Sequence, residues 1–233
     1  MVPSAAIALS RATDPITTPV TKFGGKPCWL EAAQWPLGRK FGVPMEFLGQ
    51  IALADVPSLP ASLCASGRVA YLFMTGWVED DEKGVPSTWD AEAGENVVIL
   101  QPDGRSIIVP TEEVSVYDEN LYLECHVQRT LQEEPEMVDP DSGHLGVVSS
   151  EVYSQDGSNS LHDLLAANKL GGIPCFIQYI EYPPTGGPWH FVLQLSEFTQ
   201  LPDGTYFSPN FGMGQAHVFV SEDGREGRLL WQC

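Results

Sequence analysis

Six polar residues recur at matching places in two similar segments of the chain, and they are its best candidates for chemistry. They are Glu46, Gln50, Tyr71, His190, Gln194 and His217. A glutamate and a histidine that face each other can exchange a proton with a substrate, which is general acid–base catalysis. Paired amides can bind a ligand through hydrogen bonds. We therefore expect the six residues to line one ligand-binding concavity, with no catalytic residue identified among them.

The alternative interpretation is structural. An inward-pointing glutamine commonly satisfies the buried N–H and C=O groups of a loop. Gln50 and Gln194 would then hold loops in place, and the sequence would identify no site. The five histidines show no short spacing typical of metal ligands. We expect neither a metal site nor a cofactor.

The six candidates lie in a sequence that occurs twice. KFGGKPCWLEAAQWP (Lys22 to Pro36) returns as KLGGIPCFIQYIEYP (Lys169 to Pro183). Further along, PMEFLGQI returns as PWHFVLQL, and VAYLFMT returns as QAHVFVS. Loop insertions between fixed elements produce such changes in spacing. The pattern predicts two copies of one unit, and we expect them to superpose about a pseudo-two-fold axis.

The repeated blocks also predict local structure. Alternating residues in EFLGQIAL and HFVLQLSE are typical of strands, in which Glu46 and Gln50 would share one face. The segment SLHDLLAANKLGG favours a helix that begins at Ser160 and ends at Gly171 or Gly172. Cys28 and Cys175 lie at the same place in the two copies, and they could form either a disulfide or two buried thiols.

These elements predict an α+β fold dominated by strands, an internally duplicated, pseudo-two-fold β-rich unit with few helices. We expect residues 1–21 to form an N-terminal arm and residues 22–233 a single domain. Within that domain, the first repeat would span 22–78, a peripheral central insertion 79–158, and the second repeat 159–233. A length of 233 residues suits one β-rich domain.

The charge of the chain restricts its partners. It carries 12 Lys and Arg against 31 Asp and Glu, a net charge of −19. This balance argues against nucleic acids and anionic membranes, both of which attract basic proteins. No apolar stretch is long enough for a membrane helix, and no basic segment indicates a signal peptide. We expect a soluble, cytoplasmic protein. Two acidic runs, Glu79 to Glu82 and Glu133 to Asp141, are solvated loops, a docking surface for a basic partner, or a place where divalent cations bind loosely.

Several motifs together indicate a family. FGGKP, WP, PMEFLGQIAL, LGGIP and the closing LLWQC follow one another in an order that resembles the YwqG-like family of bacterial proteins, a domain of unknown function. The resemblance spans residues 22–233. It implies an internally duplicated, β-dominated α+β fold, and it implies no established activity.

Two function classes remain open. The charge and the absence of the common catalytic motifs favour a binding protein, such as an immunity-like inhibitor of a basic partner. The alternative is a small-ligand binder or enzyme that uses a cleft between the repeats, supported by Glu46 with His190 and by Gln50 with Gln194. We expect a monomer or weak dimer in either case.

Overall fold

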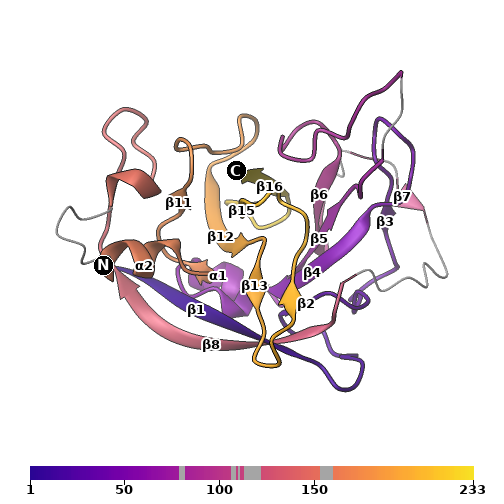
Figure 1. Ribbon diagram of the computed structural model, residues 1–233, viewed down its shortest axis with the longest axis horizontal. Coiled ribbons are helices and arrows are strands. Elements are labelled where there is room, and N and C mark those ends of the chain that lie inside the picture. Colours follow the sequence, from indigo (N-terminus) through magenta and orange to yellow (C-terminus); the bar gives the residue numbers. More distant parts are fainter. Residues whose placement is uncertain (79–81, 106–108, 110, 113–121, 153–159) are drawn as a thin grey trace.

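The computed structural model describes residues 1–78, 82–105, 109, 111–112, 122–152 and 160–233. Strands dominate this part of the chain. Ten of the described strands close into a barrel, and two short α-helices lie outside it (Figure 1). The expected β-dominated α+β class with few helices is confirmed.

The barrel strands follow the order β1, β10, β12, β15, β16, β6, β5, β4, β2 and β8, and β8 pairs with β1 to close the ring. Their bounds are β1 (Val2–Arg11), β2 (Lys22–Phe23), β4 (Glu46–Ala52), β5 (Val69–Met74), β6 (Asn96–Gln101), β8 (Cys125–Glu134), β10 (Lys169–Gly171), β12 (Trp189–Ser196), β15 (Gln215–Ser221) and β16 (Gly227–Gln232). Small two-stranded sheets join β3 (Trp35–Pro36) to β7 (Thr111–Glu112), β9 (Val147–Val148) to β11 (Cys175–Phe176), and β13 (Thr199–Gln200) to β14 (Tyr206–Phe207). The helices are α1 (Ala61–Cys64) and α2 (Ser160–Ala166), and 3-10 turns span Leu53–Asp55 and Ser149–Glu151.

The ring consists of two halves with the same kind of strand order. One half runs β8-β2-β4-β5-β6, and the other runs β1-β10-β12-β15-β16. Gln50 pairs with Tyr71 across β4 and β5, and Gln194 pairs with His217 across β12 and β15. The halves meet along β1 and β8 on one side and along β6 and β16 on the other. Residues that align in the two sequence segments therefore take the same register positions.

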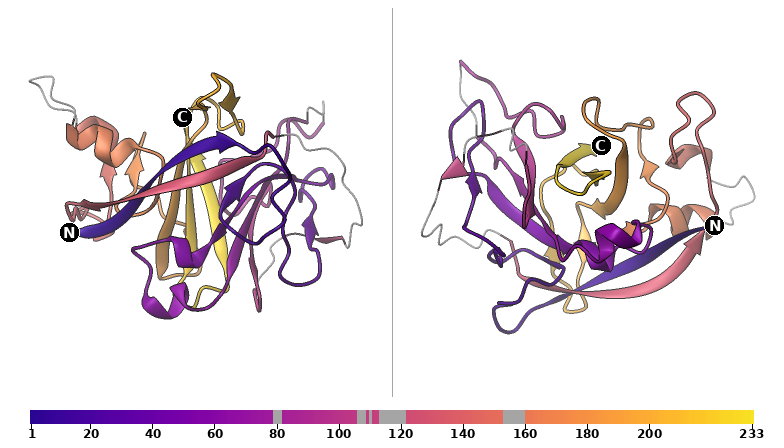
Figure 2. Two further views of the ribbon diagram at one scale, coloured as in Figure 1. Left: turned by 90° about the horizontal axis from the view of Figure 1, so that it is seen from below. Right: turned by 180° about the vertical axis from the view of Figure 1, so that it is seen from behind.

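Residues 1–21 do not form an arm, and that expectation is wrong. β1 pairs with β8 along its whole length and with β10 at its centre. Figure 2 shows β1 and β8 as two long strands lying side by side. Ala5, Ile7 and Leu9 of β1 are buried in the barrel core. Every second residue of this apolar run points into the barrel, which is the pattern of a strand with one buried face. The run is short, but this alternation is enough to make it a barrel strand.

The expected central insertion is not wholly peripheral either. Residues 79–158 contribute β6 and β8 to the barrel. Glu134, in the second acidic run, is fully buried. Of the first acidic run, Glu79, Asp80 and Asp81 lie outside the described residues. A peripheral position is therefore wrong for β6 and β8.

A β-bulge in β4 changes which residues share a face. The pairing with β5 shifts between Phe47 and Gly49, and β12 carries a similar shift in its pairing with β15. A bulge adds one residue to a strand, so the alternation of side chains reverses beyond it. Gln50 consequently lies on the outer face with Phe47, whereas Glu46 lies on the opposite face. The expectation that Glu46 and Gln50 share a face is wrong for this reason.

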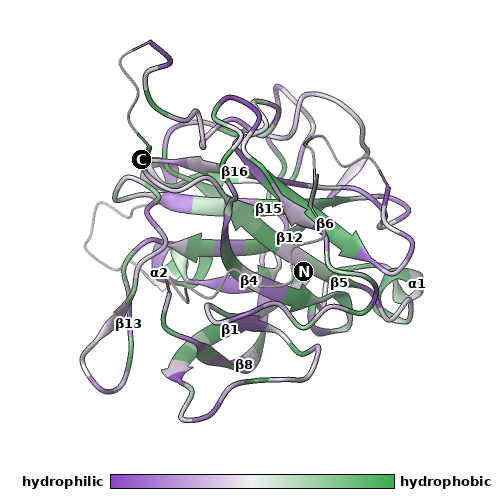
Figure 3. Cartoon of the chain, turned by 90° about the vertical axis from the view of Figure 1, so that its right-hand side faces the viewer, coloured by the Kyte–Doolittle hydropathy of each residue, from purple (hydrophilic) through white to green (hydrophobic). Residues whose placement is uncertain are grey.

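Apolar residues cover both faces of the central strands. The largest cluster fills the barrel interior and includes Leu72 and Val218. Separate clusters pack on the outside of each half, around Phe73 in one and Phe219 in the other. Because both faces are covered, every residue of β5 and β15 is buried. Green, the colour of hydrophobic residues, is accordingly concentrated on the barrel strands (Figure 3).

The helix expected from SLHDLLAANKLGG is α2. It begins at Ser160 as expected and ends at Ala166, before the glycines. The chain leaves the helix early because Lys169–Gly171 enters the barrel as β10, between β1 and β12. No helix in the described part of the chain has both the length and the apolar character needed to span a membrane.

Candidate functional site

Gln50 and Gln194 bind loop backbone in the same way. Both side chains are fully buried. The Gln50 amide accepts a hydrogen bond from Cys28 N at 2.8 Å and donates one to Val20 O at 2.9 Å. The Gln194 amide accepts one from Cys175 N at 2.8 Å and donates to the carbonyl oxygens of Leu165 and Ala167. Each amide thus holds the segment that follows a Gly-Gly turn.

Tyr71 and His217 extend this arrangement on the neighbouring strands. The Tyr71 hydroxyl donates to Cys28 O at 2.8 Å and accepts from Leu30 N at 3.0 Å. His217 Nε2 lies 3.3 Å from Cys175 O. Burial raises the pKa of Tyr71, and burial lowers the pKa of His217 to about 3. Both rings are therefore neutral at physiological pH.

A third strand of each half adds a glutamine that the sequence analysis missed. Gln101 accepts hydrogen bonds from the backbone N–H groups of Leu30 and Glu31. Gln232 accepts one from Gln178 N and donates to Tyr179 O. The signal was present in the sequence, because VILQP and LLWQC end the corresponding strands of the two halves. We call residues 28–32 and 175–179 the two straps, since three strands hold each of them.

The strap cysteines are free thiols, as are the other three cysteines. The alternative of a disulfide is therefore wrong. The Gly-Gly pair ahead of each strap has positive φ at Gly24, Gly25, Gly171 and Gly172. Only glycine adopts this conformation without steric cost, which explains why both copies carry the pair.

We expect Gln50→Ala and Gln194→Ala each to lower the free energy of unfolding by about 1–3 kcal/mol, because each leaves buried backbone groups without a partner. Urea unfolding of purified variants measures this loss. Gln128 is exposed on β8, and Gln128→Ala is the matched control, expected to change stability by less than about 0.5 kcal/mol. Losses no larger than that of the control would show that the two amides are not scaffold residues.

Glu46 and His190 lie in different surroundings. Glu46 accepts a hydrogen bond from the Tyr122 hydroxyl at 2.7 Å, and burial raises the pKa of its carboxyl. His190 lines a polar cavity with His144 and Trp189, and burial lowers its pKa. Among the described residues its buried Nε2 has no hydrogen-bond partner. The six candidates are thus distributed over several local environments.

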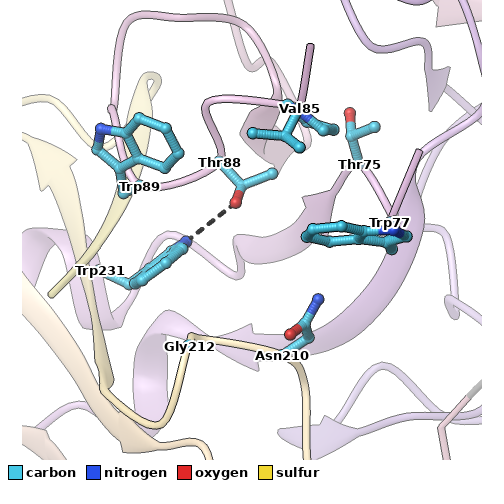
Figure 4. A pocket seen from close by; sticks show the side chains of 10 residues that line it. Thr75, Trp77, Val85, Thr88, Trp89, Asn210, Gly212 and Trp231 are labelled. Carbon is cyan, nitrogen blue, oxygen red and sulfur yellow. Dashed lines mark hydrogen bonds between the residues drawn. The ribbon is translucent and has the colours of Figure 1, made fainter. Parts of the chain in front are cut away.

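A different concavity lies at one open end of the barrel. It has a volume of about 140 Å³, and we call it the tryptophan cavity (Figure 4). Its lining residues follow β5, precede β6 and β15, or lie near the end of β16, and they are Thr75, Gly76, Trp77, Val85, Pro86, Thr88, Trp89, Asn210, Gly212 and Trp231. Four chain segments that are distant in sequence therefore build it.

Two tryptophans of this cavity contact neighbouring side chains, and a third is largely exposed to solvent. Trp231 Nε1 donates to Thr88 Oγ1 at 3.2 Å, and Trp89 packs edge-on against Trp231 with ring centroids 6.2 Å apart. Trp77 lies across the cavity from Trp231 and is 71% exposed (Figure 4). The Asn210 carboxamide points from below into the space between them. The cavity thus offers aromatic walls and one polar group to a ligand.

Two carboxylates lie just outside the cavity, against its lining residues Thr75 and Gly76. The Thr75 hydroxyl donates to Glu95 Oε2 at 2.7 Å, and Glu95 is almost fully buried. On the other side, the Glu46 carboxylate lies against Gly76, so closely that an added Cβ would clash with it. None of the lining residues is Lys, Arg or His. The charges beside this cavity are therefore negative on its inner side.

A second hollow continues the first. It shares Trp89 and Trp231 with the tryptophan cavity and is also lined by Tyr179 of the second strap and Glu181. The Glu181 carboxylate accepts a hydrogen bond from Gln232 at 2.9 Å. In the described part of the chain, no group of three His, Cys, Asp or Glu side chains is placed to hold a metal ion.

This cavity could not be predicted from the sequence. Trp77 and Trp89 come from a loop and Trp231 comes from β16, and no periodic pattern relates the three. The one available signal was the density of tryptophan beside turns, at Trp77 and Trp89.

Comparison with known families gives one match. The profile of a family described as a domain of unknown function, DUF1963, matches residues 21–149. No curated protein matches the chain.

Proposed function

The chain belongs to the DUF1963 family, a domain family of unknown function, and we propose that it is a binding protein whose ligand occupies the tryptophan cavity. The observation that carries this proposal is the position of Trp77, Trp231 and Asn210 around one concavity at the open end of the barrel. Mouths of barrels are common places for ligand sites, which combine aromatic walls with a few polar groups.

The exposure of Trp77 supports a ligand. Tryptophan has the largest side chain and is highly buried on average, yet Trp77 is 71% exposed and Trp89 is 47% exposed. Exposed aromatic rings that line one hollow mark an interaction site rather than scattered surface residues. The ligand is either a small molecule or a side chain that a partner protein inserts, as an immunity-like inhibitor of a basic partner would require.

Internal duplication is part of the same proposal. The matching strand orders, the equivalent bulges and the paired glutamines on both straps support descent from one duplicated unit. The motif order that resembles YwqG-like proteins supports the same origin. The tryptophan cavity breaks this symmetry, because Trp77 and Trp89 belong to the first half and its following loop. One ligand per chain is therefore expected.

We expect ligand binding to perturb Trp77 and Trp231 and to leave the tryptophans outside the cavity unchanged. Fluorine NMR of 5-fluorotryptophan-labelled protein measures this, with choline, N-acetyl-lysine-N-methylamide, chitotriose and N-acetyl-proline-N-methylamide as probes. At least one probe should shift the resonances of Trp77 and Trp231, while Trp35, whose indole donates to Met45 O, stays fixed.

Trp77→Ala should abolish the shift of the Trp231 resonance, and it should fold because Trp77 is exposed. Tyr206→Ala removes an exposed aromatic ring on β14 and is the matched control, in which the shift persists. If all four probes leave the Trp77 and Trp231 resonances unchanged, the proposed function is wrong.

A further inference from the structure

We infer that the tryptophan cavity selects an alkylammonium group, the chemistry shared by a quaternary ammonium compound and a lysine side chain. This inference rests on the proposed function and adds the charge of the ligand to it. The observations that carry it are the indole rings around the cavity and the two carboxylates behind its floor.

The aromatic walls suit a cation. A cation over the face of an indole ring is attracted by the negative face of the π system, and tryptophan provides the strongest such interaction among the side chains. Trp77 and Trp231 lie on opposite sides of the cavity (Figure 4). A cation in the cavity therefore lies between two indole rings.

The size of the cavity suits a small head group. An engineered protein cavity of roughly 150 Å³ accommodates a benzene molecule of six carbon atoms. The tryptophan cavity, at about 140 Å³, therefore has room for a trimethylammonium group or for the end of a lysine side chain. The Asn210 carboxamide, which points into the same space, supplies an oxygen that can accept a hydrogen bond from a lysine ammonium.

The surrounding charges favour a cation over a neutral or anionic group. Glu95 lies directly behind Thr75, and Glu46 lies directly behind Gly76. Carboxylates in a partly buried setting act through a lower dielectric constant than surface charges, so their field reaches the cavity with less screening. The net charge of −19 adds a long-range attraction for cations.

Two lysines near the cavity wall oppose this field, and one of them, Lys83, has its Nζ 5.7 Å from the centre of the Phe41 ring. Lys40 Nζ donates to the carbonyl oxygen of Val85, a lining residue, at 3.3 Å. Its ammonium group also lies 5.5 Å from the centre of the Phe41 ring. Lys40 therefore sits beside the cavity wall rather than in the cavity, and its removal should strengthen cation binding.

The experiment compares a cation with a neutral molecule of the same shape. Isothermal titration calorimetry with choline and with 3,3-dimethylbutan-1-ol isolates the charge, because a carbon atom replaces the nitrogen. We expect choline to bind about ten-fold more tightly. Trp77→Ala should remove this preference, and Lys40→Met should increase the affinity for choline about two-fold to three-fold. Glu46→Gln should reduce the preference, since Gln keeps the size of the side chain and removes its charge.

A second pair of probes identifies the source of the cation. N-acetyl-lysine-N-methylamide and its norleucine counterpart differ in the terminal ammonium group alone. Tighter binding of the lysine compound than of choline assigns the site to a lysine of a protein partner, and the reverse order assigns it to a small quaternary ammonium compound.

Equal affinity for choline and 3,3-dimethylbutan-1-ol would overturn the inference, and so would a preference for chitotriose. Either result would leave the proposed function intact, because a ligand would still occupy the cavity. The absence of binding by every probe would overturn both.

Discussion

Lys169→Met should lower the free energy of unfolding by about 3–5 kcal/mol, because it leaves a buried carboxylate without its cation. Lys169 and Glu134 are both fully buried, and Lys169 Nζ donates to both Glu134 oxygens at 3.0 Å. The same ammonium group donates to Ile173 O at 2.6 Å, and Glu134 Oε2 accepts from Ile173 N at 2.7 Å. The ion pair therefore fixes the backbone just ahead of the second strap. Urea unfolding at neutral pH measures the loss.

The other half of the barrel supplies the matched control. Lys22 pairs with Glu124, whose side chain is 16% exposed, so water can solvate the carboxylate once the lysine is removed. Lys22→Met should therefore cost clearly less than Lys169→Met. The double variant Lys169→Met/Glu134→Met should recover part of the loss, since no unpaired charge stays buried. Equal losses in Lys169→Met and Lys22→Met would contradict this account.

His217→Tyr should make the protein markedly less sensitive to acid. Burial lowers the pKa of His217 to about 3 in the folded protein, against about 6.5 in an unfolded chain. The stabilising contribution is therefore fully present above about pH 6.5 and is lost as the pH falls toward 3. Linkage gives a loss of about 1.4 kcal/mol per pH unit in this window, or about 3 kcal/mol between pH 6.5 and pH 4. The tyrosine variant lacks this contribution.

Tyrosine is the appropriate replacement because the equivalent register position in the other half is Tyr71. An aromatic ring packs on each of them at a centroid distance of 4.5 Å, Trp29 on Tyr71 and Phe176 on His217. Urea unfolding at pH 6.5 and pH 4 gives the comparison. His126 is exposed on β8, and His126→Tyr should keep the acid sensitivity of the unmodified protein. The same sensitivity in His217→Tyr would show that other groups cause it.

The strand-rich class could be predicted from the sequence because it depends on local patterns. The alternation in EFLGQIAL and HFVLQLSE is a local signal, and the structure carries β4 and β12 at the predicted places. The bulge in β4 could not be predicted, because alternation alone does not show where an extra residue enters. One inserted residue moved Gln50 to the outer face and separated it from Glu46.

The candidate site was harder to predict for a different reason. The polar residues chosen from the repeats, such as Gln50 and Gln194, recur because both halves need their straps held. Recurrence of these residues in both halves thus indicates shared scaffolding. The tryptophan cavity occurs once, and its walls, such as Trp77 and Trp231, come together only when the ring closes. No local pattern relates them.

The pairing of β1 has a consequence for biosynthesis. Ala6 in β1 pairs with Thr130 in β8 and with Lys169 in β10, so β1 is synthesised long before the strands that it pairs with. Until then, β1 is an edge without neighbours, and exposed strand edges readily pair with other chains. Contacts between residues that lie far apart in the sequence also slow folding. Closure of the ring is therefore a late event that must wait for β16, and the period before it is when a holdase chaperone would be of most use to this protein.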